Sequence, residues 1–300
     1  MLDPRAPSLD QLQVFLAIVE AGSFTGAARR LGRAPSVVSY AIGNLEAQLG
    51  LELFDRKSTR KPRLTEAGQA IVSNTRGIAA GVDDLLAKAR GLQAGLEAEV
   101  ALAVDVMLPT ERLVDALEGF GAAFPTVTLR LYVEALGAVA QLVLDRRAGI
   151  GVSGPMQTAL RGLETREIGT VLLVPVAAPS HPLAQIEGPI PAAVTREHVQ
   201  LVLTDRSPLT AGQEFAVLAV RTWRLADLGA KHALLLAGIG WGSLPEPMAR
   251  ADLAAGRLVR LALDQWDNQR YAFQSIHRPD APPGPAARWL IERLAASAKT

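Results

Sequence analysis

Three short apolar stripes at helical spacing fill the first fifty positions of this chain. Residues that begin helices and residues that end them stand at the borders of these stripes. The border residues are Ser8 with Gln11 as a capping-box pair, Gly22, Ser23, Gly32 and Pro35. The stripes are Leu12, Phe15, Leu16 and Val19, then Phe24, Ala27, Ala28 and Leu31, then Val38, Ile42, Leu45 and Leu49. Helices this short are marginal alone, so the pattern predicts three helices packed into one small domain.

A short basic hairpin is predicted directly after the third helix. The apolar pair Leu53 and Phe54, the turn 55–63 and then Leu64 and Thr65 are typical of two short strands. The formal net charge of the chain is only +1, so a nucleic-acid partner has to be argued from where cations gather. They gather in this wing and beside it, at Arg56, Lys57, Arg60, Lys61 and Arg63 and at Arg29, Arg30 and Arg33. The wing can therefore meet phosphates.

The face of the third helix opposite its apolar stripe carries small and hydrogen-bonding side chains that can approach a DNA groove. We expect this helix to enter the major groove, while the wing and the start of the second helix hold the backbone. The expected DNA contacts are Ser23, Arg33, Pro35, Ser36, Ser39, Tyr40, Asn44, Arg56, Lys57, Arg60 and Arg63. The alternative is that any three small helices with a charged hairpin would share this pattern, since charge runs are usually solvated surface.

A heptad stripe follows the wing. Apolar residues recur in alternating steps of four and three after Thr65, a plausible helix cap. They are Ile71, Thr75, Ile78, Val82, Leu85, Ala89, Leu92 and Leu96. Four glycines at 77, 81, 91 and 95 each cost about 1 kcal/mol of helix stability relative to alanine. We therefore expect a long helix that needs a second copy as its partner. The alternative is a helix that lies on its own domain.

Beyond about residue 97 the pattern changes to strand-like runs that alternate with helical stretches. This alternation favours an α/β fold with largely parallel sheets. The predicted strands are residues 100–106, 128–134, 149–153, 171–177, 199–204, 222–226, 241–244 and 271–277. The predicted helices are residues 111–124, 138–146, 230–237, 247–255 and 286–298.

The N-terminal third resembles the LysR-type regulators. The resemblance rests on residues at fixed spacing across the whole headpiece. They are Phe15, Gly22, Ser23, Phe24, Ala27, Ala28, Leu31, Ser39, Ile42, Leu45, Glu46, Leu49, Gly50, Leu53, Phe54, Arg56, Leu64, Thr65 and Gly68. Where the family often has Gln-Pro and Arg-Gln pairs, this chain has Pro35 with Ser36 and Tyr40 with Ala41. These departures affect the expected base preference and leave the expected DNA binding in place.

The resemblance implies an architecture for the whole chain. It implies a winged helix-turn-helix over 1–65, a dimerisation helix over 66–96 and a two-subdomain effector module of the periplasmic-binding-protein type. One subdomain would combine 97–168 with 269–300, and the other would be 169–268, with chain crossings near 167–172 and 265–272. The implied partners are double-stranded operator DNA, a small-molecule effector of unknown identity, further copies in a homodimer or homotetramer, and RNA polymerase.

Candidate effector contacts are argued from strand ends, because ligands of open α/β sheets bind beyond the carboxyl ends of strands. By analogy with the family, four such ends converge on a cleft between the subdomains. The candidates are Asp105, Met107, Thr110, Ser153, Gly154, Thr204, Asp205, Arg206 and Trp241. Thr110 could instead be only a helix cap, and Trp241 could be core. Asp105 and Asp205 would repel an anion unless Arg206 compensates, so the ligand class stays open.

Several other functions are disfavoured. The chain has no cysteine, and its four histidines are scattered singly, so we expect no metal and no thiol chemistry. Residues 149–154 spell GxGxxG but are predicted to form the strand itself and precede Pro155, so no dinucleotide cofactor is expected. No secretory signal or membrane span is visible, which favours a cytoplasmic address. The remaining rival is an α/β enzyme or solute-binding protein with an accessory helical N-terminal domain.

Overall fold

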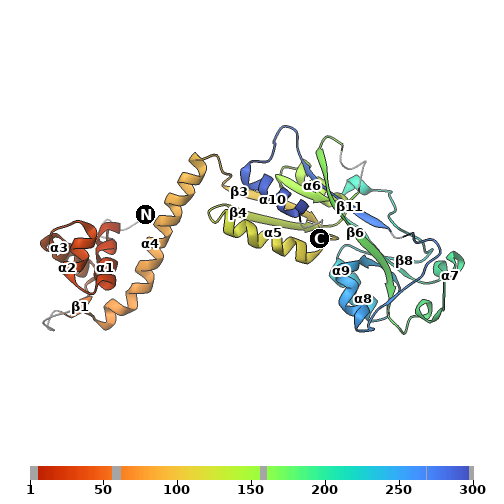
Figure 1. Ribbon diagram of the computed structural model, residues 1–300, viewed down its shortest axis with the longest axis horizontal. Helices are drawn as coiled ribbons and strands as arrows, with labels where there is room; N and C mark the ends of the chain where they lie inside the picture. Colours follow the sequence, from red (N-terminus) through yellow and green to blue (C-terminus); the bar gives the residue numbers. More distant parts are fainter. Residues whose placement is uncertain (1–5, 56–61, 156–160, 268, 297–300) are drawn as a thin grey trace. The chain divides into compact units, whose positions relative to one another are not determined.

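The computed structural model describes residues 6–55, 62–155, 161–267 and 269–296. The chain divides into two compact units, Met1–Arg90 and Gly91–Thr300 (Figure 1). Arg56, Lys57 and Arg60, three of the predicted DNA contacts, lie outside the described residues. None of the helices within the described ranges is long and apolar enough to span a bilayer.

The first unit begins with the three predicted helices, α1 (Leu9–Ala21), α2 (Phe24–Leu31) and α3 (Pro35–Leu49). The predicted border residues act as expected: Ser8 and Gln11 form a complete capping box, and Ser23 Oγ accepts a hydrogen bond of 3.0 Å from the Gly26 amide. Gly22 and Gly32 end α1 and α2 with φ of 63° and 64°, a left-handed conformation that favours glycine. Local signals therefore fix the lengths of these helices.

A two-stranded hairpin, β1 (Phe54–Asp55) and β2 (Arg63–Leu64), packs on this three-helix core. Phe54 is buried against the rings of Phe15 and Phe24, with both centroid distances at 5.5 Å. Glu46 of α3 accepts hydrogen bonds from the amides of Leu53 at 2.8 Å and Phe54 at 3.3 Å. One carboxylate thus fixes the entry to the wing relative to α3.

The long helix α4 (Glu66–Gln93) begins at Thr65, whose Oγ accepts from the Gly68 amide at 3.0 Å. Its first half packs on the headpiece core through Ile71, Val72 and Ala79. Ile78 in this half is 48% exposed, and farther along Leu85, Leu86 and Leu92 are exposed by 66%, 52% and 49%. The first half of α4 therefore lies on its own domain, as the alternative interpretation expected, whereas the apolar side chains of its second half do not.

The second unit holds a seven-stranded sheet in the order β10-β6-β11-β5-β3-β4, with β9 also paired to β6. Its strands are β3 (Glu99–Asp105), β4 (Thr128–Glu134), β5 (Ile150–Ser153), β6 (Glu164–Ala177), β9 (Gly242–Pro245), β10 (Val259–Arg260) and β11 (Arg270–His277). The expectation of largely parallel sheets is wrong here. Only β3 with β4 and β3 with β5 are parallel, because β11 returns antiparallel to both β5 and β6, and β9 and β10 run antiparallel to β6.

The strands of this sheet are divided between two lobes of the second unit. Lobe I contains β3, β4 and β5 with helices α5 (Thr110–Ala123), α6 (Gly137–Leu144) and α10 (Pro285–Ala296). Lobe II contains β9, β10 and the parallel pair β7 (Gln200–Leu203) and β8 (Thr222–Leu225). Its helices are α7 (Ala192–Glu197), α8 (Leu228–Leu236) and α9 (Glu246–Ala254), with short 3-10 turns η1 (Pro182–Gln185) and η2 (Pro208–Thr210).

The strand β6 belongs to both lobes. Its first part pairs with β11 from Glu164 to Leu172, and its last residues pair with β9 and β10 (Figure 1). The sequence pattern predicted only residues 171–177 of this strand. The earlier residues are polar and mostly exposed, so they lack the apolar run that marks a buried strand.

Arg112 of α5 is a buried residue whose side chain contacts three distant segments of the second unit. Its Nε donates to the Leu294 carbonyl at 2.6 Å, and its Nη2 donates to the Ile168 carbonyl at 2.5 Å. Its guanidinium carbon also lies 5.8 Å from the centre of the Phe273 ring, a cation–π distance. Burial lowers the pKa of this arginine.

We expect Arg112→Met to destabilise the second unit by about 3 kcal/mol, since it leaves two buried carbonyls without charged donors. All four tryptophans lie in this unit, so urea unfolding followed by tryptophan fluorescence reports on it alone. The control is Arg130→Met, which removes an exposed pair with Glu99 and should lower the free energy of unfolding far less than Arg112→Met does. Equal losses in the free energy of unfolding for both variants would contradict this bridging role of Arg112.

Candidate nucleic-acid interface and ligand cavity

The recognition candidate α3 has one buried side and one exposed side. Val38, Ile42 and Leu45 are fully buried, whereas Pro35, Ser36, Ser39 and Tyr40 are exposed and Asn44 is half-buried. Positions 36, 40 and 44 are four apart, so they share one face of the helix. The structure thus brings the predicted base-reading residues together on the surface of α3.

Val37 is part of this exposed face, although polarity alone did not point to it. Its side chain is 48% exposed, and that of Tyr40, three residues on, is 71% exposed. The helical spacing from Tyr40 could have identified Val37. The whole of α3 carries no lysine or arginine, so the face offers apolar, hydroxyl and amide groups to a groove.

Two of the candidates for contact with the DNA backbone, Arg33 and Ser23, already have hydrogen-bond partners in the headpiece. Arg33 forms a two-point ion pair with Asp10, at 2.9 and 2.5 Å, and this hydrogen bonding lowers the pKa of the Asp10 carboxyl. The Ser23 hydroxyl caps α2, as described above. Arg63 is exposed on β2, opposite Asp55 in the hairpin register. Arg63 is thus the described candidate whose side chain lies on the surface of the wing.

A cavity of about 250 Å³ lies where β6, β7, β9 and β11 meet α8. Its wall combines residues from both lobes, such as Met107 after β3, Leu136 before α6 and Tyr271 on β11. Met107 is the one predicted effector residue in this wall. The other residues that line it are Pro155, Leu173, Gln200, Leu201, Val202, Leu203, Glu214, Phe215, Ala216, Lys231, Ser243, Gln269 and Arg270.

Asp105 lies behind this wall. One carboxylate oxygen accepts from the Met107 amide at 2.8 Å, and the other accepts from the Tyr271 hydroxyl at 2.7 Å. The side chain is fully buried, and burial raises the pKa of Asp105 to about 6, against the lowering effect of these donors. Asp105 therefore orients Met107 and Tyr271, two residues of the cavity wall.

Gly154 makes room for Tyr271. A Cβ atom at this glycine would lie 1.9 Å from the tyrosine hydroxyl oxygen, so no other residue fits without moving the ring. Ser153, the preceding residue, is fully buried, and its Oγ has no hydrogen-bond partner within the described ranges. These two candidates stand beside the Asp105–Tyr271 pair and are not part of the cavity wall.

The remaining candidates divide among three places. Thr204 and Asp205 line a second, much smaller cavity of about 20 Å³, where the Thr210 hydroxyl donates to Asp205. Arg206 and Thr110 are exposed and line neither cavity, and Thr110 is not the cap of α5 because Pro109 holds that position. Trp241 is fully buried in an apolar cluster of lobe II and also lines neither cavity.

Lys231 is the wall residue that sequence reasoning missed. It lies on α8, its side chain is only 2% exposed, and burial lowers its pKa to about 8. The signal in the sequence is a single lysine within the otherwise apolar stretch LGAKHALLL. Gly242 faces it closely, since a Cβ atom there would lie 3.1 Å from Lys231 Cε.

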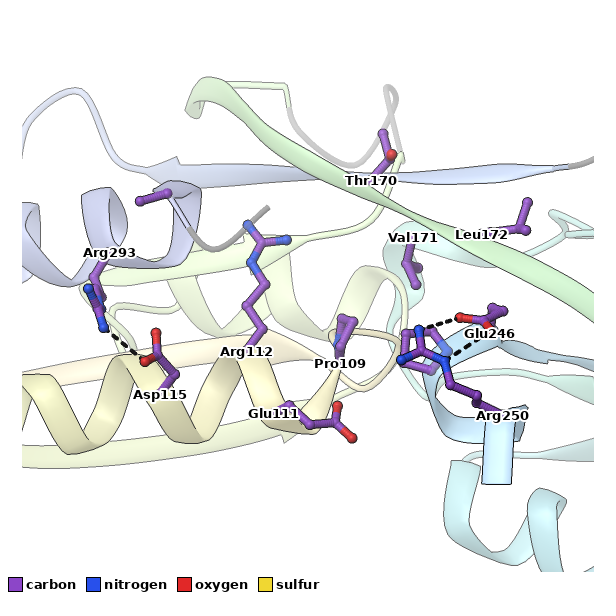
Figure 2. Close-up of a pocket in the computed structure, with 12 residues that line it drawn as sticks. Pro109, Glu111, Arg112, Asp115, Thr170, Val171, Leu172, Glu246, Arg250 and Arg293 are labelled. Carbon is purple, nitrogen blue, oxygen red and sulfur yellow. Dashed lines mark hydrogen bonds and ion pairs between the residues drawn. The ribbon is translucent and has the colours of Figure 1, made fainter. Parts of the chain in front are cut away.

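A larger hollow of about 810 Å³ lies between α5, α9, α10 and β6 (Figure 2). Most of its charged side chains are engaged within the protein. Figure 2 shows Arg250 paired with Glu246 and Arg293 paired with Asp115, both at 2.8 Å. Arg112 is drawn between these pairs and donates to the two carbonyls named above. The hollow therefore offers fewer uncommitted polar groups than the smaller cavity.

Comparison with known proteins identifies both units. Residues 93–299 match the family described as LysR substrate binding domain, and residues 9–69 match the family described as Bacterial regulatory helix-turn-helix protein, lysR family. The chain is 29% identical over 265 residues to the probable HTH-type transcriptional regulator YhaJ of Escherichia coli K12, covering 86% of this chain and 87% of YhaJ. It is 27% identical over 295 residues to the HTH-type transcriptional regulator AceR of Acinetobacter baumannii, covering 95% of each.

Solved structures agree along the full length. ArgP from Mycobacterium tuberculosis superimposes with a TM-score of 0.54 at 25% identity, covering 99% of this chain and 98% of ArgP. The LysG regulator of Corynebacterium glutamicum, solved with bound effector Arg, gives a TM-score of 0.53 at 23% identity, covering 97% of this chain and 98% of LysG. With both family matches covering the two units in order, the chain belongs to the LysR family of bacterial helix-turn-helix transcriptional regulators.

Proposed function

We propose that this regulator reads operator DNA with the exposed face of α3 and is switched by a small molecule in the 250 Å³ cavity. The observation that carries the proposal is that this cavity takes its wall from both lobes, including Tyr271, whose hydroxyl is held from behind the wall by Asp105. The relatives named above are transcriptional regulators, so the rival reading as an enzyme is set aside. LysG holding arginine as an effector supports a ligand role for this module.

In this proposal, base reading and backbone holding are separate tasks of the headpiece. Pro35, Ser36, Ser39, Tyr40 and Asn44 approach base edges, with Val37 added from the structure. The residues proposed to hold the phosphate backbone are Ser23, Arg33, Arg56, Lys57, Arg60 and Arg63. Arg33 has to share its guanidinium between Asp10 and a phosphate, so Arg63 is the better-placed anchor of the two.

The exposed apolar side chains of α4 support self-association. Ile78, Leu85 and Leu92 are seven apart, as in a coiled-coil seam, and each is about half exposed or more. A homodimer would bury this seam and present two α3 helices to a two-fold operator. We propose the homodimer as the DNA-binding unit, a homotetramer as its further assembly, and RNA polymerase as the partner at the promoter.

Switching is proposed to act through the strands that join the lobes. A ligand changes the population of two states only as far as it binds one more tightly than the other. Because the cavity wall includes Tyr271 of β11 and Lys231 of α8, its occupancy depends on how the lobes are placed. Protonation of Asp105 changes the hydrogen bonds that hold two wall residues, Met107 and Tyr271.

The DNA-binding proposal predicts different effects for two variants. Tyr40→Ala should change the ranking of operators that differ by one base pair. Arg63→Ala should weaken all of them alike and reduce the salt slope of the logarithm of the affinity by about one. Fluorescence anisotropy with DNA from upstream of the gene, at several salt concentrations, measures both. Equal losses of affinity on every operator for both variants would contradict the proposal that base reading and backbone holding are separate.

The self-association proposal predicts that Leu85→Glu lowers the dimer population, because a charge would be buried in the seam. Sedimentation over a range of protein concentrations should show a dissociation constant raised by about tenfold or more. Ala80→Glu adds the same charge on the opposite side of α4 by helical spacing, and it should leave the constant nearly unchanged. An unaltered dimer in Leu85→Glu would rule out this seam.

The buried Asp105 predicts a pH effect on stability. Its pKa rises from 3.8 to about 6 on folding, so the folded state binds its proton more tightly than the unfolded state does. This contribution to stability is present below pH 4 and is lost as pH rises through 6, amounting to about 3 kcal/mol. Asp105→Asn cannot titrate, so its stability relative to the wild type should increase between pH 4 and 6.

Urea unfolding at stepped pH values, followed by tryptophan fluorescence, measures this difference. Tyr271→Phe removes one donor that lowers the pKa of Asp105, and it should move the window to higher pH. A difference between Asp105→Asn and wild type that stays constant from pH 4 to 6 would contradict the assignment.

A further inference from the structure

The cavity wall contains a buried amine that has no counter-charge. Lys231 is 2% exposed, and within the described part of the chain its Nζ has no hydrogen bond or ion pair. A pKa of about 8 leaves this amine mostly protonated at neutral pH. A buried charge without a partner is costly, so a protein that keeps one at a cavity wall is suited to a partner that arrives with the ligand.

Within the described residues, none of the acids near this cavity pairs with Lys231. Asp105 accepts from Tyr271 and Met107, as shown above, and it stands behind the wall. Glu214 is in the wall, but both of its oxygens accept from Arg224, at 2.6 and 2.9 Å. Asp205 belongs to the neighbouring cavity of about 20 Å³. Asp105 and Asp205 are not in this wall, but their hydrogen bonds come from neutral donors and leave their charges in place, so Lys231 has to hold an anion here against their repulsion.

The rest of the wall is mostly apolar and the space is small. Met107, Leu136, Leu201 and Phe215 surround the volume of about 250 Å³, which is below the range of cavities that hold drug-sized ligands. Gln200 offers little to a ligand, since its amide donates to the Ala216 carbonyl and accepts from the Leu218 and Ala219 amides. The side chains of Ser243, Gln269 and Arg270 are further polar groups at the wall.

We propose that the effector of this regulator is a small monocarboxylate with an apolar body, whose carboxylate pairs with Lys231. This inference rests on the proposed role of the cavity as the effector site and names the ligand class. A phosphate monoester shares the negative charge but carries more of it and demands more charged donors than one buried amine. Lys231 is the buried cation of the described wall, whereas Arg270 is exposed, so the buried charge matches a single carboxylate.

The test uses full-length protein and thermal unfolding followed by tryptophan fluorescence, because a ligand that binds the folded state raises its melting temperature. The probes are sodium benzoate and sodium hexanoate, each compared with its neutral amide, benzamide or hexanamide, and with phenyl phosphate. We expect the two carboxylates to raise the melting temperature and the amides and phenyl phosphate to have little effect. Above pH 8 the benzoate affinity should fall roughly tenfold per pH unit as the amine loses its proton.

Two variants separate a ligand contact from a structural role. Lys231→Met should weaken benzoate binding about tenfold or more, while the unliganded protein melts at the same or a higher temperature because an unpaired buried charge is gone. The control Arg196→Met removes an exposed cation of α7 that does not line the cavity, and it should retain the binding. A Lys231→Met protein that melts lower without ligand and still binds benzoate would assign Lys231 a structural role and overturn the proposal.

The remaining outcomes also decide the question. Amides that stabilise as well as the acids, or phenyl phosphate that stabilises better than benzoate, would overturn the carboxylate while leaving the cavity as the ligand site. Failure of every probe would overturn small monocarboxylates as the ligand class. In each of these cases the DNA-binding proposal stands or falls separately, by the operator measurements described for Tyr40 and Arg63.

Discussion

The antiparallel pairing of β6 with β11 is the interaction on which the effector module depends. It runs from Glu164 opposite His277 to Leu172 opposite Arg270, with a shift of register between Phe273 and Gln274. Beyond this pairing, β11 also joins β5, and the end of β6 joins β9 and β10. A change in the placement of the lobes must therefore be absorbed by these two strands or by the segments next to them.

The functional side chains cluster around this strand pair for a physical reason. Tyr271 of β11 is nearly buried, and its hydroxyl needs an acceptor, which Asp105 supplies from the end of β3. Gly154, at the end of β5, is the position that gives the ring its space. The same three strand ends thus satisfy the polar groups of the junction and shape the wall of the cavity, so packing and ligand binding share residues here.

The sequence predicted what local interactions determine. Ser8, Gly22 and Ser23 act on atoms within four residues, and the helices they border form as expected. The direction of β11 was not predictable in this way, because its partners are more than one hundred residues away in the chain. Lys231 was missed because a lysine on a helix is usually exposed, and tertiary packing, including the close approach of Gly242 on β9, buries it. Arg33 was predicted to contact DNA, and tertiary packing also pairs it with Asp10.

The energy available at Lys231 is of the size that a ligand switch needs. Lowering the pKa from 10.5 to about 8 corresponds to roughly 3 kcal/mol of lost stabilisation of the charged amine. Couplings between two sites of a protein are typically about 1–3 kcal/mol. A carboxylate that restores this stabilisation in only one arrangement of the lobes would bias the equilibrium by an amount in that range. A neutral ligand of the same shape has no such charge to offer, so it would have to draw its bias from apolar contacts within about 250 Å³.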